Sequence, residues 1–564
     1  MGELKKTFLA GFAVLIILLL APYYLEWIGY NDVRLSNQEI ETEVALPSAE
    51  TLSPNRPKTQ TIQSPFAKNI KNVNEESVTV HTSLYTAVIS NIGGGSLKHY
   101  RLKNYYGAWE NGVYVDSINV SLLSSSEESC APCVGSNNIT FDLPFECSAS
   151  MGWKNNKNLY LSENESIEIV CSYVDENGEN YTKITTLHEG SFVFEHEILN
   201  NNSNQDIYLT WDSGINNTEK NLYDENSYSG ASISYNKEIE TASFIPGSLQ
   251  DKLDALNYVG DIDWAAFRNK YFIMAMIPEK SSIIKNVKIG GGTRQLTENG
   301  FSPSYYATLG GLGNIKIKNY LGPLDIDNIN SLNTTLDRIM NFGWFVIQPF
   351  SRGILWLLKF LHSFGLNYGV ILILFAFLVR IVTGPLTKKS FESTQKMQAI
   401  QPKLKKIQDK YKSDPQKLNT EMVKLYRDNN VNPVGGCIPM LLQMPLLFSL
   451  FLVFRSTIEF RGAPFFGWIK DLSLPDTIFN LPFTIPVYGD QVAFLPILLG
   501  ISMFLTQKMS MANMQGSASQ QKYMMYFMSG FFFLIFNSFP SGLNLYYLIY
   551  NILNYLQQKS LKKA

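Results

Sequence analysis

Five apolar segments dominate the last third of the chain and restrict its fold more than any other feature. They lie at residues 367–387, 437–455, 492–508, 523–538 and 541–557. Such segments form transmembrane helices, because helical hydrogen bonding satisfies every backbone polar group within a bilayer. Several are shorter than the ~20 residues that cross a normal bilayer core, which predicts little tilt or a locally thinned membrane.

A further apolar run near the start of the chain predicts a sixth span. It extends from Phe8 to Tyr24 and follows Lys5 and Lys6. A secretory signal peptide begins in the same way, but no small-x-small cleavage site follows this run. We therefore interpret residues 1–30 as an uncleaved transmembrane anchor.

The distribution of Lys and Arg predicts the orientation of these spans. Between Lys388 and Arg427, eleven Lys or Arg residues stand against four Asp or Glu residues, whereas the loop 456–491 has only Arg461 and Lys470. By the positive-inside rule, the first loop is cytoplasmic and the second is external. The pattern predicts a multi-pass protein of the cell inner membrane with both termini in the cytoplasm and residues 31–340 mainly in the periplasm. The net charge of −2 gives no sign of nucleic-acid binding.

The region between the anchor and the apolar third is polar. Residues 31–75 are rich in polar residues, Pro and Ser, which is typical of a flexible linker. Residues 76–330 contain many short β-type runs separated by Asn, Gly and Ser, including a glycine turn at 93–95. This pattern predicts a periplasmic all-β sandwich.

Four cysteines lie in this polar region and a fifth, Cys437, stands apart. The four are Cys130, Cys133, Cys147 and Cys171. They allow two disulfides with three possible pairings. We interpret the Cys-Ala-Pro-Cys pair as a structural disulfide or as free thiols rather than a redox motif, because no βαβ pattern surrounds it.

Two segments outside the spans are predicted to form amphipathic helices. Residues 338–365 are interpreted as a periplasmic interfacial helix, with Phe350 and Ile354 on its apolar face and Pro349 at its start. Residues 388–430 have helical spacing on both sides of a Ser-Asp-Pro turn, which predicts a cytosolic hairpin. The five spans and this hairpin make up a core at 366–558, followed by a basic tail at 559–564.

Arg380 interrupts the first of the five apolar segments. At about 1.5 Å per residue it lies ~12 Å from Lys388, the next cation along the helix. Snorkelling to the interface is one explanation, and a functional arginine facing a cavity is the one that we favour. Because these segments contain no Asp or Glu, neutral side chains and water must surround the charge. Candidate partners are Gln443, Asn544, Tyr547 and Asn551, the last three on one helical face.

Other motifs carry weaker functional signals. Met444, Met503, Met528 and Phe532 belong to an apolar, methionine-rich set of residues that suits varied apolar partners, although lipid-facing or core packing explains each one equally well. Ser393-Thr-Gln-Lys396 matches S-x-x-K without its companion motifs, and His188 and His196 lack metal-binding spacing. We expect no catalytic residue, metal or cofactor.

Four stretches resemble the signature sequences of the YidC/Oxa/Alb membrane-protein insertases. They are FLVRIVTGPLTKKS, NPVGGCIPMLLQMPLLFSLF, EFRGAPFFGWIKDLS and FPSGLNLYYLIYNILNYLQQ. The order of the segments, the anchor and the large β domain are similar to the Gram-negative type. The resemblance is strong over about 340–560, and NKYFIMAMIP at 269–278 is similar to a family segment. Ala376, one turn before Arg380, departs from relatives of this type, in which a polar residue is common, and the Cys-Ala-Pro-Cys pair has no counterpart.

The resemblance implies an insertase and chaperone of integral membrane proteins. Arg380 matches the family's groove arginine, Tyr547 matches a tyrosine linked to substrate contact, and the hairpin matches the segment needed for insertion, where Lys403, Lys405 and Lys406 would recruit the substrate. Implied partners are nascent membrane proteins, the Sec translocon with its accessory subunits, the ribosome and signal-recognition-particle pathway, and membrane lipids, with the monomer as the functional unit. The alternatives are an anion-selective transporter or channel that uses Arg380, and a periplasmic binding module that the spans anchor.

Overall fold

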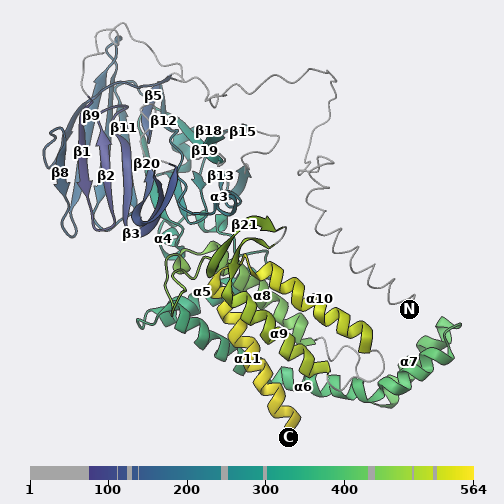
Figure 1. Cartoon of the computed structure of the whole chain (residues 1–564). Coiled ribbons are helices and arrows are strands. Elements are labelled where there is room, and N and C mark those ends of the chain that lie inside the picture. The colour runs from purple at the N-terminus through teal and green to yellow at the C-terminus, as the bar shows by residue number, and fades with distance from the viewer. Residues whose placement is uncertain are drawn as a thin grey trace, which may run out of the picture. The chain divides into compact units, whose positions relative to one another are not determined.

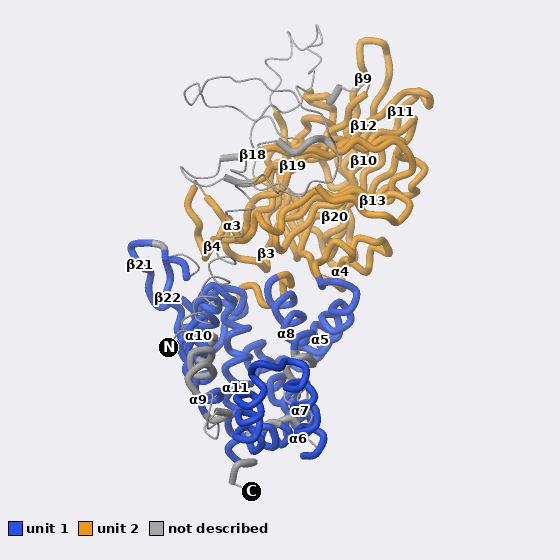
Figure 2. Tube along the Cα trace, turned by 90° about the vertical axis from the view of Figure 1, so that its right-hand side faces the viewer, with its two compact units in different colours: residues 1–51, 342–455, 463–564 blue, residues 52–341, 456–462 orange. Residues whose placement is uncertain are grey.

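The computed structural model describes residues 75–563 except 111, 124–129, 137–138, 243–251, 296–300, 430–437, 486–487 and 512–517. The expected anchor at 1–30 and all of the expected linker before residue 75 lie outside the described residues. The described chain divides into two compact units (Figure 2). A β-rich unit ends at Asn341 and also includes residues 456–462, and a helical unit contains residues 342–455 and the rest of the chain after 462.

The described residues of the β-rich unit form three sheets (Figure 1). The first has the order β4-β3-β2-β1-β8, with β1 Ser77–His81, β2 Tyr85–Ser90, β3 Ser96–Glu110, β4 Val113–Leu123 and β8 Lys157–Tyr160. The second has the order β14-β13-β16-β17-β20-β11-β10-β9-β7, with β7 Glu146–Ala149, β9 Ser166–Val174, β10 Asn180–His188, β11 Val193–Asn200, β13 Gly230–Tyr235, β14 Glu238–Ala242, β16 Trp264–Arg268, β17 Phe272–Pro278 and β20 Ile315–Pro323. The third has the order β15-β18-β19-β12-β5-β6, with β5 Cys133–Ser136, β6 Ile139–Thr140, β12 Asp206–Trp211, β15 Lys252–Val259, β18 Ile284–Gln295 and β19 Phe301–Leu312. The expected β sandwich is thus confirmed.

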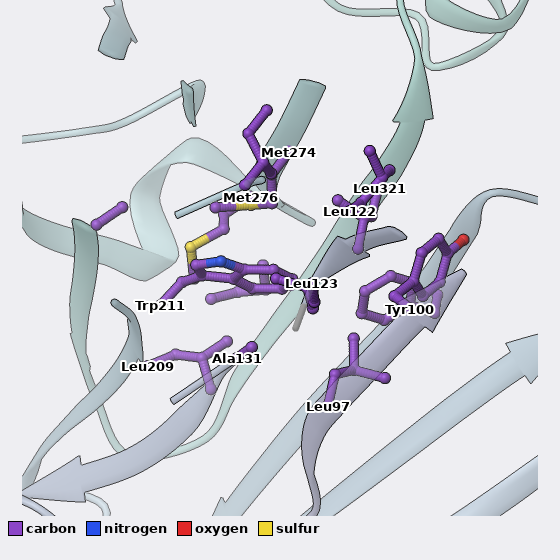
Figure 3. Close-up of a cluster of buried hydrophobic side chains, with 14 of the residues drawn as sticks. Leu97, Tyr100, Leu122, Leu123, Ala131, Leu209, Trp211, Met274, Met276 and Leu321 are labelled. Atoms are coloured by element: carbon purple, nitrogen blue, oxygen red, sulfur yellow. The ribbon is translucent and has the colours of Figure 1, made fainter. Parts of the chain in front are cut away.

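Strands β10 and β17 show how strand sequence matches position in a sheet. In β10, Tyr181, Lys183, Thr185 and Leu187 point to the buried side while the residues between them are more exposed, which is the period-two pattern of a one-sided strand. Every residue of β17 is buried, as expected for an apolar strand that is covered on both faces. The resulting core contains Trp211, Met274 and Met276 beside Leu97, Tyr100 and Leu321 (Figure 3).

The glycine turn, the cysteines and a buried lysine meet in one part of this unit. Cys130 pairs with Cys133, and Cys147 pairs with Cys171, which lies opposite it on β9. The backbone of Gly93 has φ of +66°, and a Cβ there would lie 2.3 Å from the Cys133 sulfur, so only glycine fits. Lys183 donates to the carbonyls of Gly95 and Pro132. Because burial favours the neutral amine, the pKa of Lys183 falls to about 7.

Arg461 joins a segment that is distant in the sequence to the β-rich unit. Its guanidinium pairs with the Glu219 carboxylate at 2.6 Å and donates to the carbonyls of Tyr106, Gly107 and Thr218. Glu225, fully buried beside Glu219, accepts from the side chain of Asn217 and the backbone N–H of Thr218. An arginine at this position therefore satisfies a carboxylate that is almost fully removed from water.

The helical unit begins with α5 and contains seven long helices among its described residues. They are α5 Gln348–His362, α6 Tyr368–Lys410, α7 Pro415–Asp428, α8 Ile438–Ser456, α9 Phe494–Met511, α10 Ala518–Phe536 and α11 Ser541–Lys563. The shorter helices of the chain are α3 Leu222–Asn226, α4 Ile326–Ser331, η1 Ser281–Ile283, η2 Leu336–Ile339 and η3 Ile458–Phe460. All five predicted apolar segments form helices. Residues 368–389 alone are long and apolar enough to meet a strict criterion for a span in the described chain, with shorter apolar helices at 444–456 and 494–508.

Three features of this unit differ from or extend the sequence expectations. α5 covers less than the expected range 338–365; it buries Ile354, Leu355 and Leu358 and exposes Phe350, Trp356 and Phe360. The first arm of the 388–430 hairpin is continuous with α6, and α7 begins after the N-cap Asp414 (Figure 1). The loop that precedes α9 contains an unexpected hairpin of β21 Thr477–Ile485 and β22 Gly489–Ala493.

Candidate functional site

One face of α6 is buried and the other is exposed and apolar. Ile371, Leu372, Phe375, Ala376, Val379 and Arg380 are buried, at the spacing of a single helical face. The exposed side chains include Leu374, Phe377, Leu378, Ile381 and Val382. A helix with this pattern packs on one side against its own protein and presents the other side to lipid. Arg380 is therefore directed into the protein.

Helix α11 supplies the surface that faces Arg380. Tyr546, Tyr550, Asn554 and Gln557 follow each other at intervals of four, four and three residues, so they share one helical face. The Tyr546 ring packs against that of Phe375, with centroids 5.6 Å apart, and Tyr550 lies below the guanidinium at 5.6 Å. Phe375 of α6 thus contacts Tyr546 of α11, and the later residue Arg380 contacts later residues of α11. The two helices are therefore parallel neighbours.

The guanidinium of Arg380 has neutral partners. Its Nη2 donates to Oδ1 of Asn554 at 2.9 Å and also to Oε1 of Gln557. Its Nε and Nη1 are buried and have no hydrogen-bond partner among the described residues, and the residue as a whole is 8% exposed. Within the described chain no carboxylate balances this charge. The site therefore contains a desolvated cation with donors left to bind water or an anion.

A proline lies just beyond Arg380 in α6, and the carbonyl of the residue before it also contacts α11. Pro385 has no N–H to donate, and its ring disturbs the local helical ladder. Gln557 Nε2 donates to the Gly384 carbonyl at 3.3 Å, while the Thr383 hydroxyl donates to the carbonyl of Val379. Gln557 therefore bonds both to Arg380 and to the turn of α6 that precedes Pro385. These two bonds help to fix the position of the guanidinium.

The residues expected to surround Arg380 lie elsewhere or are not described. Asn544 donates to the carbonyls of Phe536 and Phe539 and so stabilises the turn between α10 and α11. Tyr547 packs on the Phe536 ring, and its hydroxyl has no hydrogen-bond partner among the described residues. Gln443 belongs to α8, but its side chain lies outside the described part of the structure. Among the described residues, the side chains that accept hydrogen bonds from Arg380 are Asn554 and Gln557.

The other predicted residues are spread over several helices. Met444 is exposed on α8, Met503 is half-buried on α9, and Phe532 is half-buried on α10, where its ring packs against Phe531 and Phe536. The side chain of Met528 is not described. Lys403, Lys405 and Lys406 are exposed on the distal part of α6.

Position along the helices was a signal that could have identified the amide partners of Arg380. Arg380 follows the first residue of α6 by 12 positions, and Asn554 follows that of α11 by 13. Two spans that begin on the same side of a membrane bring residues with similar offsets to a similar depth. Asn544 is only three positions into α11, which is too early to reach Arg380.

A helical membrane core with a buried arginine, preceded by a large β domain, defines a class of polytopic membrane proteins. Comparison with known families assigns both parts. Residues 77–357 match the model of the YidC periplasmic domain, and residues 360–564 match that of the 60Kd inner membrane protein.

Named relatives extend this match over most of the chain. A membrane protein insertase YidC of Chloroherpeton thalassium is 33% identical over 86% of this chain and 82% of its own length. That of Pelodictyon phaeoclathratiforme is 40% identical over 63% of this chain and 61% of its own length. The chain therefore belongs to the YidC family of membrane protein insertases.

A solved structure of the same family gives a weaker comparison. A crystal structure of an active YidC insertase with its first transmembrane domain resolved matches 86% of this chain and 92% of its own, at 18% identity and a TM-score of 0.34. At that TM-score the likeness carries no argument about the arrangement of the elements. The family assignment rests on the sequence matches.

Proposed function

We propose that this insertase uses Arg380 as a fixed intramembrane cation that attracts the acidic, translocated tail of a substrate protein. The burial of Arg380 among neutral partners, with two donor nitrogens left without a protein partner in the described chain, carries the proposal. A charge that is not balanced by the protein attracts an opposite charge more strongly in an environment of low dielectric constant than in water. A passing carboxylate would supply the missing counter-charge.

The insertion step itself is physical in this proposal. Moving a hydrated tail through ~30 Å of hydrocarbon is the main barrier, and a hydrated groove open to the cytoplasm shortens the dry path. The apolar segment of the substrate then moves along the surface that includes Met444, Met503, Met528 and Phe532, and its burial in lipid provides the driving force. No hydrolysis of nucleotides is required.

The topology and the partners belong to the same proposal. Both termini lie in the cytoplasm, residues 31–340 lie mainly in the periplasm, and the basic segment 388–430 lies in the cytoplasm, as the positive-inside rule requires. Nascent membrane proteins reach the chain from the ribosome and signal-recognition-particle pathway, either directly or through the Sec translocon. A monomer suffices, because every group that the proposal uses belongs to one chain.

Site-specific photocrosslinking tests this function. We expect that a photoreactive phenylalanine analogue at Phe532 crosslinks to a stalled nascent membrane protein in vesicles. The matched control is Ile552, which is exposed on α11 about 160° around the helix from the face that carries Tyr550 and Asn554. Position 552 should react with lipid only. If both positions react with lipid alone, the proposed path of the substrate is wrong.

The exposed lysines of the cytosolic hairpin lead to a separate prediction. Replacing Lys403, Lys405 and Lys406 by glutamine should weaken binding of ribosome–nascent chain complexes several-fold, because positive charges steer an anionic partner. The matched control replaces Lys410, Lys412 and Lys417, at the tip of the same hairpin, by glutamine. Co-sedimentation with vesicles measures the binding. Unchanged binding by the first variant would contradict the recruiting role of these three lysines.

A further inference from the structure

The β21–β22 hairpin exposes an apolar surface that the proposed insertion mechanism does not use. The exposed side chains on β21 are Ile478, Phe479, Phe483 and Ile485, of which Phe483 is 61% exposed. The register is irregular between Thr477 and Phe479 and between Asn480 and Ile485, so neighbouring residues are exposed together rather than alternately. Between residues 477 and 493 the sequence contains a single charged residue, Asp490.

The second strand of this hairpin, from the turn to its end, is fixed to the ends of two apolar helices. Asn537, which is fully buried just after α10, donates to the carbonyls of Tyr488 and Gln491 and accepts from the backbone N–H of Ala493. Ala493 directly precedes α9. The Tyr488 ring also packs against that of Phe533 on α10. The second strand is therefore held against the helices, with no linker that would let the hairpin move away from them.

The start of β21 is fixed at the same place. Asp476, the residue before this strand, accepts through Oδ2 from the N–H of Leu495 in the first turn of α9 and from the indole N–H of Trp468. Both ends of the hairpin thus meet the first turn of α9, and both strands belong to the helical unit (Figure 2). If α9 crosses the membrane, the hairpin lies at the level of the outer interface.

A two-stranded sheet is only marginally stable in water, and an apolar edge strand in water invites aggregation. Contact with the membrane interface would stabilise the hairpin and cover its apolar strand, because aromatic side chains are favoured at the boundary between headgroups and acyl chains. We infer that β21 is an interfacial anchor whose Ile478, Phe479 and Phe483 insert into the outer leaflet of the bilayer. The inference rests on the proposed topology of α9, in which Phe494 begins the span on the external side.

Depth-dependent quenching of a fluorophore tests the anchor in the full-length protein. A single cysteine is introduced at Phe483 in a Cys437→Ser background, labelled without reductant, and the protein is reconstituted into phosphatidylethanolamine–phosphatidylglycerol vesicles. The control label is at Tyr223, which is exposed on α3 of the β-rich unit. We expect several-fold stronger quenching at position 483 than at 223 by lipids with a nitroxide near the headgroup, and several-fold weaker quenching by aqueous iodide.

Two other outcomes would overturn the inference. Equal access of iodide to positions 483 and 223 would place the hairpin in water, and protection from both quenchers would mean that protein covers it. A second variant, Ile478→Ser with Phe479→Ser, should reduce lipid quenching at 483 toward the level at 223. These measurements need no substrate and are therefore independent of the crosslinking experiment. If position 483 contacts lipid but Phe532 does not crosslink to nascent chains, only the insertion mechanism is contradicted.

Discussion

Replacing Arg380 with alanine is expected to reduce the insertion of substrates with acidic translocated tails by about tenfold to a hundredfold. Hydrogen bonds to a charged group contribute about 1.5–3 kcal/mol, and about 1.4 kcal/mol corresponds to a factor of ten. The variant loses this interaction with the tail and also leaves the amide oxygens of Asn554 and Gln557 without their donor. Insertion by the Arg380→Lys variant should fall less, because lysine retains the positive charge. Lysine cannot, however, contact both amides in the same geometry.

The charge of the substrate provides the sharpest control for this prediction. Insertion is measured in vesicles from cells depleted of their own insertase, with a substrate whose tail is acidic and a matched substrate whose tail carries Asn and Gln instead. The Arg380→Ala defect should be large for the first and small for the second. Equal insertion of the acidic substrate by the native protein, Arg380→Ala and Arg380→Lys would remove Arg380 from the mechanism. Halide flux that depends on Arg380 would instead support the anion-channel alternative.

Much of the architecture could be predicted because it depends on local pattern. The apolar segments became helices within a few residues of their expected positions, and Asp414 starts α7 as an N-cap, where its side chain accepts from the Lys417 N–H. The β21–β22 hairpin could not be predicted in this way. Pro482 interrupts β21, and the irregular register of the strand removes the alternation of polar and apolar residues that indicates a strand.

The candidate site was only partly predictable. Arg380 could be identified from the sequence because burying a charge in an apolar segment is energetically costly. That cost depends only on the residue type and on its apolar neighbours in the sequence. The partners of Arg380 depend on the depth of each polar side chain along α11 as well as on its face. Tyr547 and Asn554 are seven residues apart and so share a face, and Asn544 is ten residues before Asn554. Helical periodicity therefore does not separate these candidates, and only their depth along the packed helices does.

The ion pair of Arg461 and Glu219 was invisible in the sequence for a different reason. The two residues are 242 positions apart, and neither belongs to a motif that suggests a partner. The segment that contains Arg461 follows α8 directly in the chain, yet it is part of the β-rich unit. This pair therefore fixes residues 456–462 within the β-rich unit through groups that are almost completely buried.

Replacing Arg461 with methionine should lower the free energy of unfolding of the β-rich unit by about 3–5 kcal/mol, as expected when one partner of a buried ion pair is removed. Glu219 would lose its cation, and the carbonyls of Tyr106 and Thr218 would lose their donor. The urea dependence of pulse proteolysis on the full-length protein in detergent measures this change. Lys285→Met, which breaks the exposed pair with Asp261, should change stability by no more than about 1 kcal/mol.

The pH dependence of this defect distinguishes lost electrostatic pairing from lost packing. Burial, reinforced by the charge of Glu219, raises the pKa of Glu225 from 4.5 to about 7. A raised carboxyl pKa means that the folded state binds the proton more tightly, so stability from this group is lost as the pH rises through that range. Without Arg461 no cation balances the negative charge beside Glu225, so the pKa of the Glu225 carboxyl rises further. The Arg461→Met defect should therefore be larger at about pH 8 than at about pH 5.5, and the additional change Glu219→Gln should restore part of the stability at the higher pH. A defect that is equal at both pH values and is unaffected by Glu219→Gln would assign the role of Arg461 to packing.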